Sequence, residues 1–171
     1  MLCYPQMYKK RVEDINYLKL KELGIKCLVF DLDNTIALID QDLITEEMKK
    51  FLTDLKKNFK IAIISNNKES RVKKYADILD CGYVYSAMKP FAKGFKKIAK
   101  KYNLERKEIA VIGDQLITDI MGANLFKAYP ILVEPLAKKD LKISYFNRFL
   151  EKQVFKKYDK KNIMKKGEYY D

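Results

Sequence analysis

The chain has 171 residues, 48% of them hydrophobic, which is long and apolar enough for one folded domain with its own core. It contains no histidine, which excludes Ser-His-Asp and Cys-His catalysis and every metal site with an imidazole ligand, and its three scattered cysteines argue against a disulfide scaffold or a zinc site. The formal net charge of +12 favours an anionic partner such as nucleic acid or acidic lipid, although a lysine-rich composition alone also produces such a charge.

Apolar runs alternate along the chain with segments of helical periodicity. Buried strands are predicted at residues 27–30, 61–64, 82–85, 109–112 and 131–133. Helices are predicted at residues 18–23, 45–55, 69–79, 91–102 and 120–126. The aromatic segment before residue 18 is expected only to pack on the core. Strands that alternate with helices at this spacing predict an α/β fold, a three-layer doubly wound parallel sheet of five core strands.

Polar residues follow three of the predicted strands. They are Asp31, Asp33 and Thr35 after the first strand, Ser65 after the second, and Asp114 and Asp119 after the fourth. Ligands of a parallel sheet bind beyond the carboxyl ends of its strands, so these side chains are expected to meet at one edge. Paired carboxylates there can hold a hard cation while one attacks and the other moves a proton.

With Lys89, these residues resemble the four signature motifs of the haloacid dehalogenase (HAD) superfamily of aspartate-nucleophile phosphotransferases, in the right order over residues 27–134. The resemblance implies that Asp31 is the nucleophile that forms an aspartyl phosphate and that Asp33 is the general acid and base. It also implies that Mg²⁺ is bound by Asp31, the main-chain carbonyl of Asp33 and Asp114, while Asp119 orients Asp114 or a metal-bound water.

The same resemblance implies roles for three further residues. Lys89 and Ser65 are expected to bind the phosphoryl oxygens, and Thr35 to position Asp33. Response-regulator receiver domains use similar residue types, but their lysine follows the phosphorylated aspartate and the hydroxyl. Here Lys89 precedes the second acidic pair, Asp114 and Asp119, and this order disfavours a receiver domain. The chain has no Gly-x-x-x-x-Gly-Lys loop, which excludes a P-loop NTPase.

The gaps between the motifs are too short for a lid. About ten residues separate Thr35 from the predicted helix start near Thr45, and 23 residues lie between Ser65 and Lys89. We therefore expect no cap domain and an open active site. Such a site suits a substrate whose bulk stays outside, namely a lipid, a nucleic acid or a protein.

The C-terminal segment, residues 137–171, is predicted to be a basic amphipathic helical extension of a catalytic core at about residues 25–136, within a single domain of residues 1–171. From residue 138 onward it holds eleven basic and five acidic residues. A helical projection places an apolar arc beside a basic edge; the arc is Ile143, Phe146, Leu150, Val154 and Tyr158, and the edge is Arg148, Lys152 and Lys156. Two interpretations stay open: the arc packs on the domain, or residues 138–166 contact an anionic membrane.

The motif details resemble one branch of the superfamily more closely. Asp-Leu-Asp-Asn-Thr, Ser-Asn-Asn, Lys-Pro, Gly-Asp-Gln-Leu-x-Thr-Asp and Val-Glu-Pro-Leu-Ala look like the YqeG-type HAD IIIA phosphatases. That branch is similar to the mitochondrial phosphatidylglycerophosphate phosphatases. The resemblance implies a Mg²⁺-dependent phosphomonoester hydrolase that acts on a lipid phosphate, phosphatidylglycerophosphate, in phosphatidylglycerol biosynthesis.

Location and alternative functions follow from the same features. The chain shows no signal peptide and no apolar run of the ~18 residues that cross a bilayer, so a cytoplasmic protein, peripheral at the inner face of the membrane, is expected. Two other functions stay open. One is a nucleic-acid end phosphatase, and the other is a basic RNA- or ribosome-associated binding protein with a vestigial site.

Overall fold

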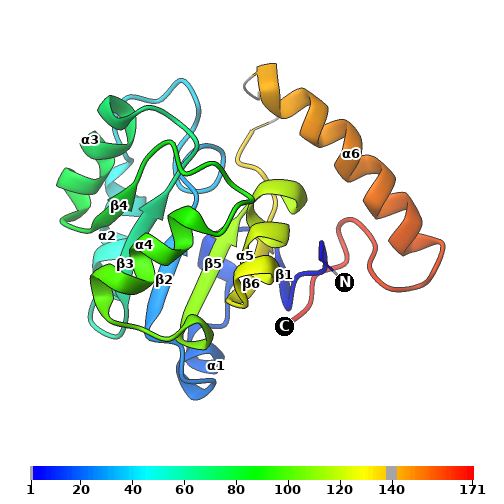
Figure 1. The fold of residues 1–171 in the computed structure, drawn as a ribbon, viewed down its shortest axis with the longest axis horizontal. Coiled ribbons are helices and arrows are strands. Elements are labelled where there is room, and N and C mark those ends of the chain that lie inside the picture. Colours follow the sequence, from blue (N-terminus) through cyan, green and yellow to red (C-terminus); the bar gives the residue numbers. More distant parts are fainter. Residues whose placement is uncertain (1, 138–141) are drawn as a thin grey trace.

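The computed structural model describes residues 2–137 and 142–171, without the side chains of residues 142–146. Its six strands form one parallel sheet in the order β1-β6-β5-β2-β3-β4 (Figure 1). The strands are β1 (Met7–Lys9), β2 (Cys27–Phe30), β3 (Lys60–Ile64), β4 (Gly82–Val84), β5 (Ile109–Gly113) and β6 (Tyr129–Val133). The five predicted strands are confirmed.

The sixth strand, β1, corrects the sequence prediction. Its three residues pair with β6, and Tyr8 also exchanges backbone hydrogen bonds with Tyr170 near the C-terminus. Both partners are more than a hundred residues away in sequence, so the short segment Met7–Lys9 shows no strand pattern of its own. The C-terminal end of the chain therefore lies against the edge of the sheet, beside the N-terminal strand (Figure 1).

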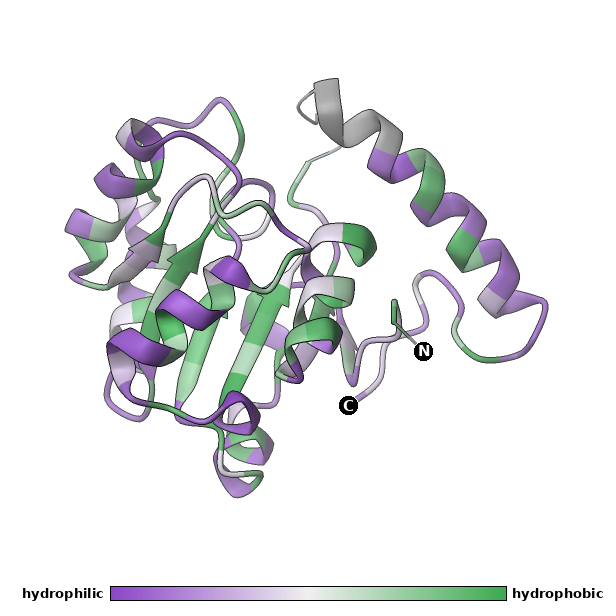
Figure 2. Ribbon diagram, viewed as in Figure 1, coloured by the Kyte–Doolittle hydropathy of each residue, from purple (hydrophilic) through white to green (hydrophobic). Residues whose placement is uncertain are grey.

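Helices cover both faces of the sheet, which confirms the predicted three layers. Alternate residues of β2 enter two separate cores: Leu28 and Phe30 pack with one, Cys27 and Val29 with the other. The first core includes side chains of α1 (Tyr17–Glu22), α2 (Glu46–Leu55) and α3 (Glu69–Leu79), and the second those of α4 (Lys93–Tyr102) and α5 (Met121–Phe126). Figure 2 shows the central strands as the most hydrophobic part of the fold.

No lid domain is inserted between the described motif residues. Residues 36–44 form a loop, and Thr45 then caps α2 by accepting a hydrogen bond from the Met48 backbone N–H at 3.2 Å. Only α3 and β4 lie between Ser65 and Lys89. One predicted boundary is wrong: α4 begins at Lys93, and Phe91, predicted on its buried face, is 69% exposed.

The long helix α6 (Lys142–Asp159) lies on the side of the sheet where β1, β6 and α5 are (Figure 1). Tyr158 is buried with Tyr8 and Leu132, and Val154 packs against the same cluster. The described end of the predicted apolar arc therefore packs on the domain. The side chains at the other end of the arc, Ile143 and Phe146, are outside the described part of the structure, as are residues 138–141 of the basic segment. Among the described helices, none is long and apolar enough to span a bilayer.

Candidate active site

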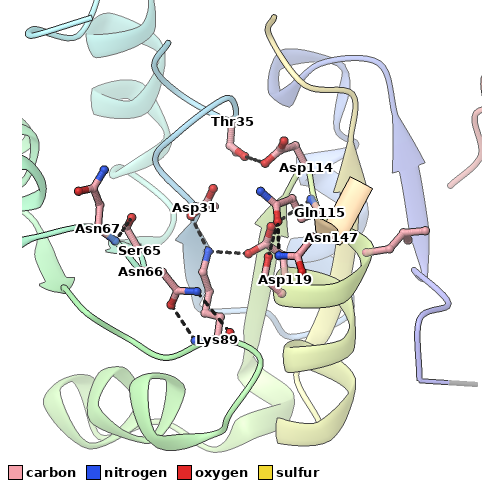
Figure 3. A network of polar contacts seen from close by, with 12 residues as sticks. Asp31, Thr35, Ser65, Asn66, Asn67, Lys89, Asp114, Gln115, Asp119 and Asn147 are labelled. Carbon is pink, nitrogen blue, oxygen red and sulfur yellow. Dashed lines mark hydrogen bonds and ion pairs between the residues drawn. The ribbon is translucent and has the colours of Figure 1, made fainter. Parts of the chain in front are cut away.

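The carboxyl ends of β2, β3 and β5 meet at one edge of the sheet, and the predicted polar residues gather there (Figure 3). Asp31, Ser65 and Asp114 directly follow these three strands. Beside them lies a pocket of about 500 Å³. Its lining includes Asp31, Asp33, Ser65, Asn66, Asn67, Lys89, Gln115, Thr118 and Asn147. The expected convergence of the motifs is therefore present in the fold.

Lys89 lies between two of the carboxylates. Its Nζ donates to Oδ1 of Asp31 at 2.5 Å and to Oδ1 of Asp119 at 2.6 Å (Figure 3). Burial would lower the pKa of Lys89, but the carboxylates of Asp119 and Asp31 outweigh that effect and raise it above its ordinary value. The ammonium therefore stays charged, and it supplies a fixed positive charge next to Asp31.

Asp31, Asp114 and Asp119 form an acidic cluster suited to a metal ion. Each contributes one carboxylate oxygen to a group whose atoms all lie within 4.8 Å of one another, and all three residues are buried. Burial, together with the carboxylates of Asp119 and Asp114, raises the pKa of Asp31 well above its ordinary value, although Lys89 opposes this shift. Three crowded hard oxygen donors fit a hard divalent cation, because its charge would offset their repulsion.

Gly113, the last residue of β5, permits the close approach of Asp119. A Cβ atom at residue 113 would lie 2.3 Å from Cγ of Asp119, much closer than two non-bonded carbon atoms can approach. Asp119 is fully buried, and its Oδ2 accepts a hydrogen bond from the Gln115 backbone N–H at 3.1 Å. The glycine of the Gly-Asp motif is therefore required by the packing of the second acidic pair.

Thr35 contacts a different acid from the one predicted. Its hydroxyl donates to Oδ1 of Asp114 at 3.2 Å (Figure 3), whereas the family resemblance implied that Thr35 positions Asp33. The reason is the tight turn after β2, where Asn34 has a φ of 63°. This turn brings the residue after it towards the loop that follows β5.

Asp33 is held by Arg71 and Asn67, two residues for which the sequence predicted no role. Oδ1 of Asp33 accepts from Arg71 Nε at 2.8 Å, and Oδ2 accepts from Asn67 Nδ2 at 3.2 Å. Arg71, in the first turn of α3, also donates to the main-chain oxygens of Leu38 and Gln41. It therefore ties Asp33 to the loop of residues 36–44. The carboxylate of Asp33 is not in the acidic cluster of the described residues, and metal binding by its main-chain carbonyl stays a prediction.

The Ser-Asn-Asn segment after β3 organises the neighbouring motif residues. Ser65 is buried, and its Oγ accepts a hydrogen bond from the Asn67 backbone N–H at 3.1 Å. The Asn66 side chain accepts from the Lys89 backbone N–H at 2.7 Å and donates to the Lys89 main-chain oxygen at 3.3 Å. Asn66 thus fixes the backbone of Lys89, a role that only the folded chain reveals.

Arg148 of α6 also belongs to the site, which corrects the predicted basic edge. Its guanidinium binds Oδ2 of Asp114 and donates to the Asp114 main-chain oxygen at 2.8 Å, while Lys152 and Lys156 are exposed. Burial raises the pKa of Asp114 to about 7, and the Arg148 guanidinium opposes that rise. A helical projection groups Arg148 with the two lysines, but it cannot show which of them faces a buried carboxylate.

Comparisons with known proteins agree with this geometry. A protein-family model described as a haloacid dehalogenase-like hydrolase matches residues 12–126. The chain is 36% identical over 151 residues to "Probable phosphatase YqeG" of Bacillus subtilis, a match that covers 88% of each chain.

Solved structures share the fold at low identity. A hypothetical protein from Xanthomonas campestris is similar with a TM-score of 0.57 and 14% identity, over 75% of this chain and 74% of that one. The HAD hydrolase YfnB from Bacillus subtilis, solved bound to magnesium, is similar with a TM-score of 0.52 and 11% identity, over 72% of this chain and 99% of that one. Similarity at this level concerns the fold alone.

Proposed function

The chain belongs to the haloacid dehalogenase-like hydrolase family, and from this membership we propose that it is a Mg²⁺-dependent phosphatase that works through an aspartyl phosphate on Asp31. The observation that carries the proposal is the contact between Asp31 and Lys89 inside the acidic cluster. A nucleophilic carboxylate needs compensating positive charge to approach a phosphate, which is also anionic. The name of the Bacillus subtilis relative, a probable phosphatase, supports the same reaction class.

In the proposed reaction, a carboxylate oxygen of Asp31 forms a bond to phosphorus, and the bond from phosphorus to the ester oxygen breaks. Asp33, which has to carry a proton when the substrate binds, gives that proton to the leaving oxygen. A water molecule then attacks phosphorus and passes a proton to Asp33, and the bond between Asp31 and phosphorus breaks, which releases inorganic phosphate. Lys89 and Ser65 line the pocket, and Lys89 Nζ and Ser65 Oγ would stabilise the phosphoryl oxygens.

The metal site of this proposal consists of Asp31, Asp114 and the main-chain carbonyl of Asp33. Asp119 is added as a ligand, beyond the orienting role that the resemblance implied, because its carboxylate lies in the same cluster. Mg²⁺ bound there would reduce the repulsion between the carboxylate and the phosphate. Buried carboxylate oxygens are the ligands that this ion prefers. YfnB, whose fold is similar, was solved bound to magnesium, and this property of that protein supports the choice of metal.

For the substrate we propose a lipid phosphate, phosphatidylglycerophosphate. No lid covers the pocket in the described chain, so a lipid could stay in the membrane while its phosphate enters. Exposed apolar side chains occur next to the motif residues, at Leu38, Met88 and Phe91. Lys152 and Lys156 on the exposed side of α6 would contact anionic headgroups. The protein would then act as a peripheral protein at the cytoplasmic face of the membrane.

A substrate panel tests this proposal. Phosphate release would be compared for phosphatidylglycerophosphate in mixed micelles, a 3′-phosphorylated DNA oligonucleotide and soluble sugar phosphates, with Asp31→Asn as the control for each. We expect the highest kcat/KM for the lipid. Preference for the DNA end would favour the nucleic-acid alternative, and efficient turnover of the sugar phosphates alone would rule out both.

A further inference from the structure

The orientation of the Asp114 carboxylate is set from two sides. Its Oδ1 accepts a hydrogen bond from Thr35 at 3.2 Å, and its Oδ2 accepts from Arg148. The side chain of Asp114 is fully buried. Each carboxylate oxygen can accept about two interactions, so both oxygens keep capacity for a metal ion while these contacts fix the plane of the group. One of the two partners comes from a motif after β2, but the other comes from the C-terminal helix.

Arg148 is itself fixed by more than this one contact. Its Nη1 donates to the Asp114 main-chain oxygen at 2.8 Å and to Oε2 of Glu151 at 2.9 Å. Oε1 of Glu151 accepts from the Leu116 backbone N–H at 2.6 Å, and Glu151 is buried although it is charged. Arg148 and Glu151 therefore join α6 to the segment that carries Asp114, through main-chain and side-chain atoms together.

The helix that carries this pair is anchored on the domain. Tyr158, near its C-terminal end, and Met164, beyond it, are buried in a cluster with Tyr8 and Leu132 of the sheet. Tyr170 then pairs with Tyr8 along the sheet edge. In addition, Asn147, the residue before Arg148, lines the pocket. Packing therefore holds this helix where Arg148 can reach the acidic cluster.

We propose that Arg148 is a positioning residue that holds the Asp114 carboxylate in its metal-binding orientation, so that α6 is part of the metal site. This inference rests on the proposed metal-dependent function. Residues behind a metal ligand fix its orientation, and their loss commonly weakens metal binding by about 10–100-fold.

The charges around Arg148 indicate whether it supports metal binding at Asp114 or competes with the metal ion for that carboxylate. A lone guanidinium next to Asp114 would repel a metal ion and compete for the carboxylate. Arg148, however, is also paired with Glu151, whose negative charge balances it. The pair therefore supplies directed hydrogen bonds without adding net positive charge beside the acidic cluster. This balance of charge favours a positioning role for Arg148 over competition with the metal ion.

The test measures the dissociation constant of Mn²⁺ for purified full-length protein by isothermal titration calorimetry. Arg148→Gln should weaken Mn²⁺ binding roughly 10–100-fold. Arg148→Lys keeps the charge but not the planar fork, so its affinity should fall between those of Arg148→Gln and the wild type. Arg106→Gln is the matched control, because it removes an exposed arginine just before β5, at the opposite end of that strand from Asp114, and it should bind as the wild type does.

Two further measurements distinguish a variant that does not fold from an error in the proposed metal site and from an error in the role of Arg148. Circular dichroism and thermal melts of each variant show whether it is folded, and Arg148→Lys tests the proposal if Arg148→Gln does not fold. Asp114→Asn should lose Mn²⁺ binding; if it does not, the proposed metal site itself is wrong. If Asp114→Asn loses binding while folded Arg148→Gln binds Mn²⁺ as tightly as the wild type, or more tightly, the proposal for Arg148 is overturned.

Discussion

Arg71 Nη2 lies 2.7 Å from Oδ1 of Asp33, and the same guanidinium binds main-chain oxygens of the loop between β2 and α2. Both side chains of this ion pair are largely buried. An arginine outside the motifs therefore holds the proposed general acid and the loop next to it in one arrangement. Arg148 bears a similar relation to Asp114, so two of the chain's four arginines contact acids of the site.

The first prediction concerns Arg71. Arg71→Met should lower kcat, by up to roughly 10²-fold, because misplacement of a reacting group by about 1 Å can cost that much. Limited proteolysis should also cleave residues 36–44 faster than in the wild type, since the loop loses its contacts. Lys74→Gln, an exposed change on the same helix, is the control for both assays. Unchanged kcat in Arg71→Met would show that Asp33 does not depend on this ion pair.

The second prediction concerns Gly113. Gly113→Ala places a methyl group against Asp119, so it should destabilise the protein by about 1–3 kcal/mol, the usual cost of overpacking. Urea unfolding measures this free energy. The cost should shrink when Asp119→Gly is combined with Gly113→Ala, because the clashing side chain is then absent. An equal cost in both backgrounds would contradict the packing explanation.

The third prediction concerns pH and the metal-free protein. Burial raises the pKa of Asp114 to about 7, against an ordinary value of 3.8. Between these values the unfolded chain releases a proton that the folded protein keeps, so this group's contribution to stability falls as pH rises from about 4 to 7. Thermal melts in EDTA across this range should show a steeper fall of Tm for the wild type than for Asp114→Asn. Parallel curves would contradict the shifted pKa.

The fourth prediction concerns the exposed lysines of α6. Replacing Lys152 and Lys156 with glutamine should weaken binding to anionic vesicles roughly 30-fold, since each basic residue near such a surface contributes about 1 kcal/mol. Added salt should reduce wild-type binding in the same way. Turnover of a short-chain soluble substrate should not change. Equal vesicle binding by the variant and the wild type would remove these lysines from the proposed membrane contact.

The sequence predicted the sheet and the motif residues because both depend on local patterns. Short apolar runs such as Cys27–Phe30, flanked by polar residues, are typical of buried strands, and polar residues directly after parallel strands lie at the carboxyl edge of the sheet. The helix cap at Thr45 is also local. These features need no knowledge of distant contacts.

Features that depend on distant contacts could not be predicted in the same way. The strand Met7–Lys9 exists because β6 and Tyr170 pair with it. Arg71 and Arg148 lie 38 and 34 positions from the acids that they bind. Thr35 contacts Asp114, 79 positions away. In each case the residue type is ordinary for its helix or loop, and only the fold reveals its partner.

The central claim, that Asp31 is the nucleophile, is tested most directly by locating the trapped phosphoryl group. Protein with Mg²⁺ and beryllofluoride, which mimics an acyl phosphate, would be crystallised, with Asp31→Asn as the control. The mechanism predicts that beryllium is bonded to a carboxylate oxygen of Asp31 and contacts Lys89 Nζ, and that Asp31→Asn neither binds it nor turns over substrate. Beryllium on another residue, or near wild-type turnover by Asp31→Asn, would contradict the mechanism.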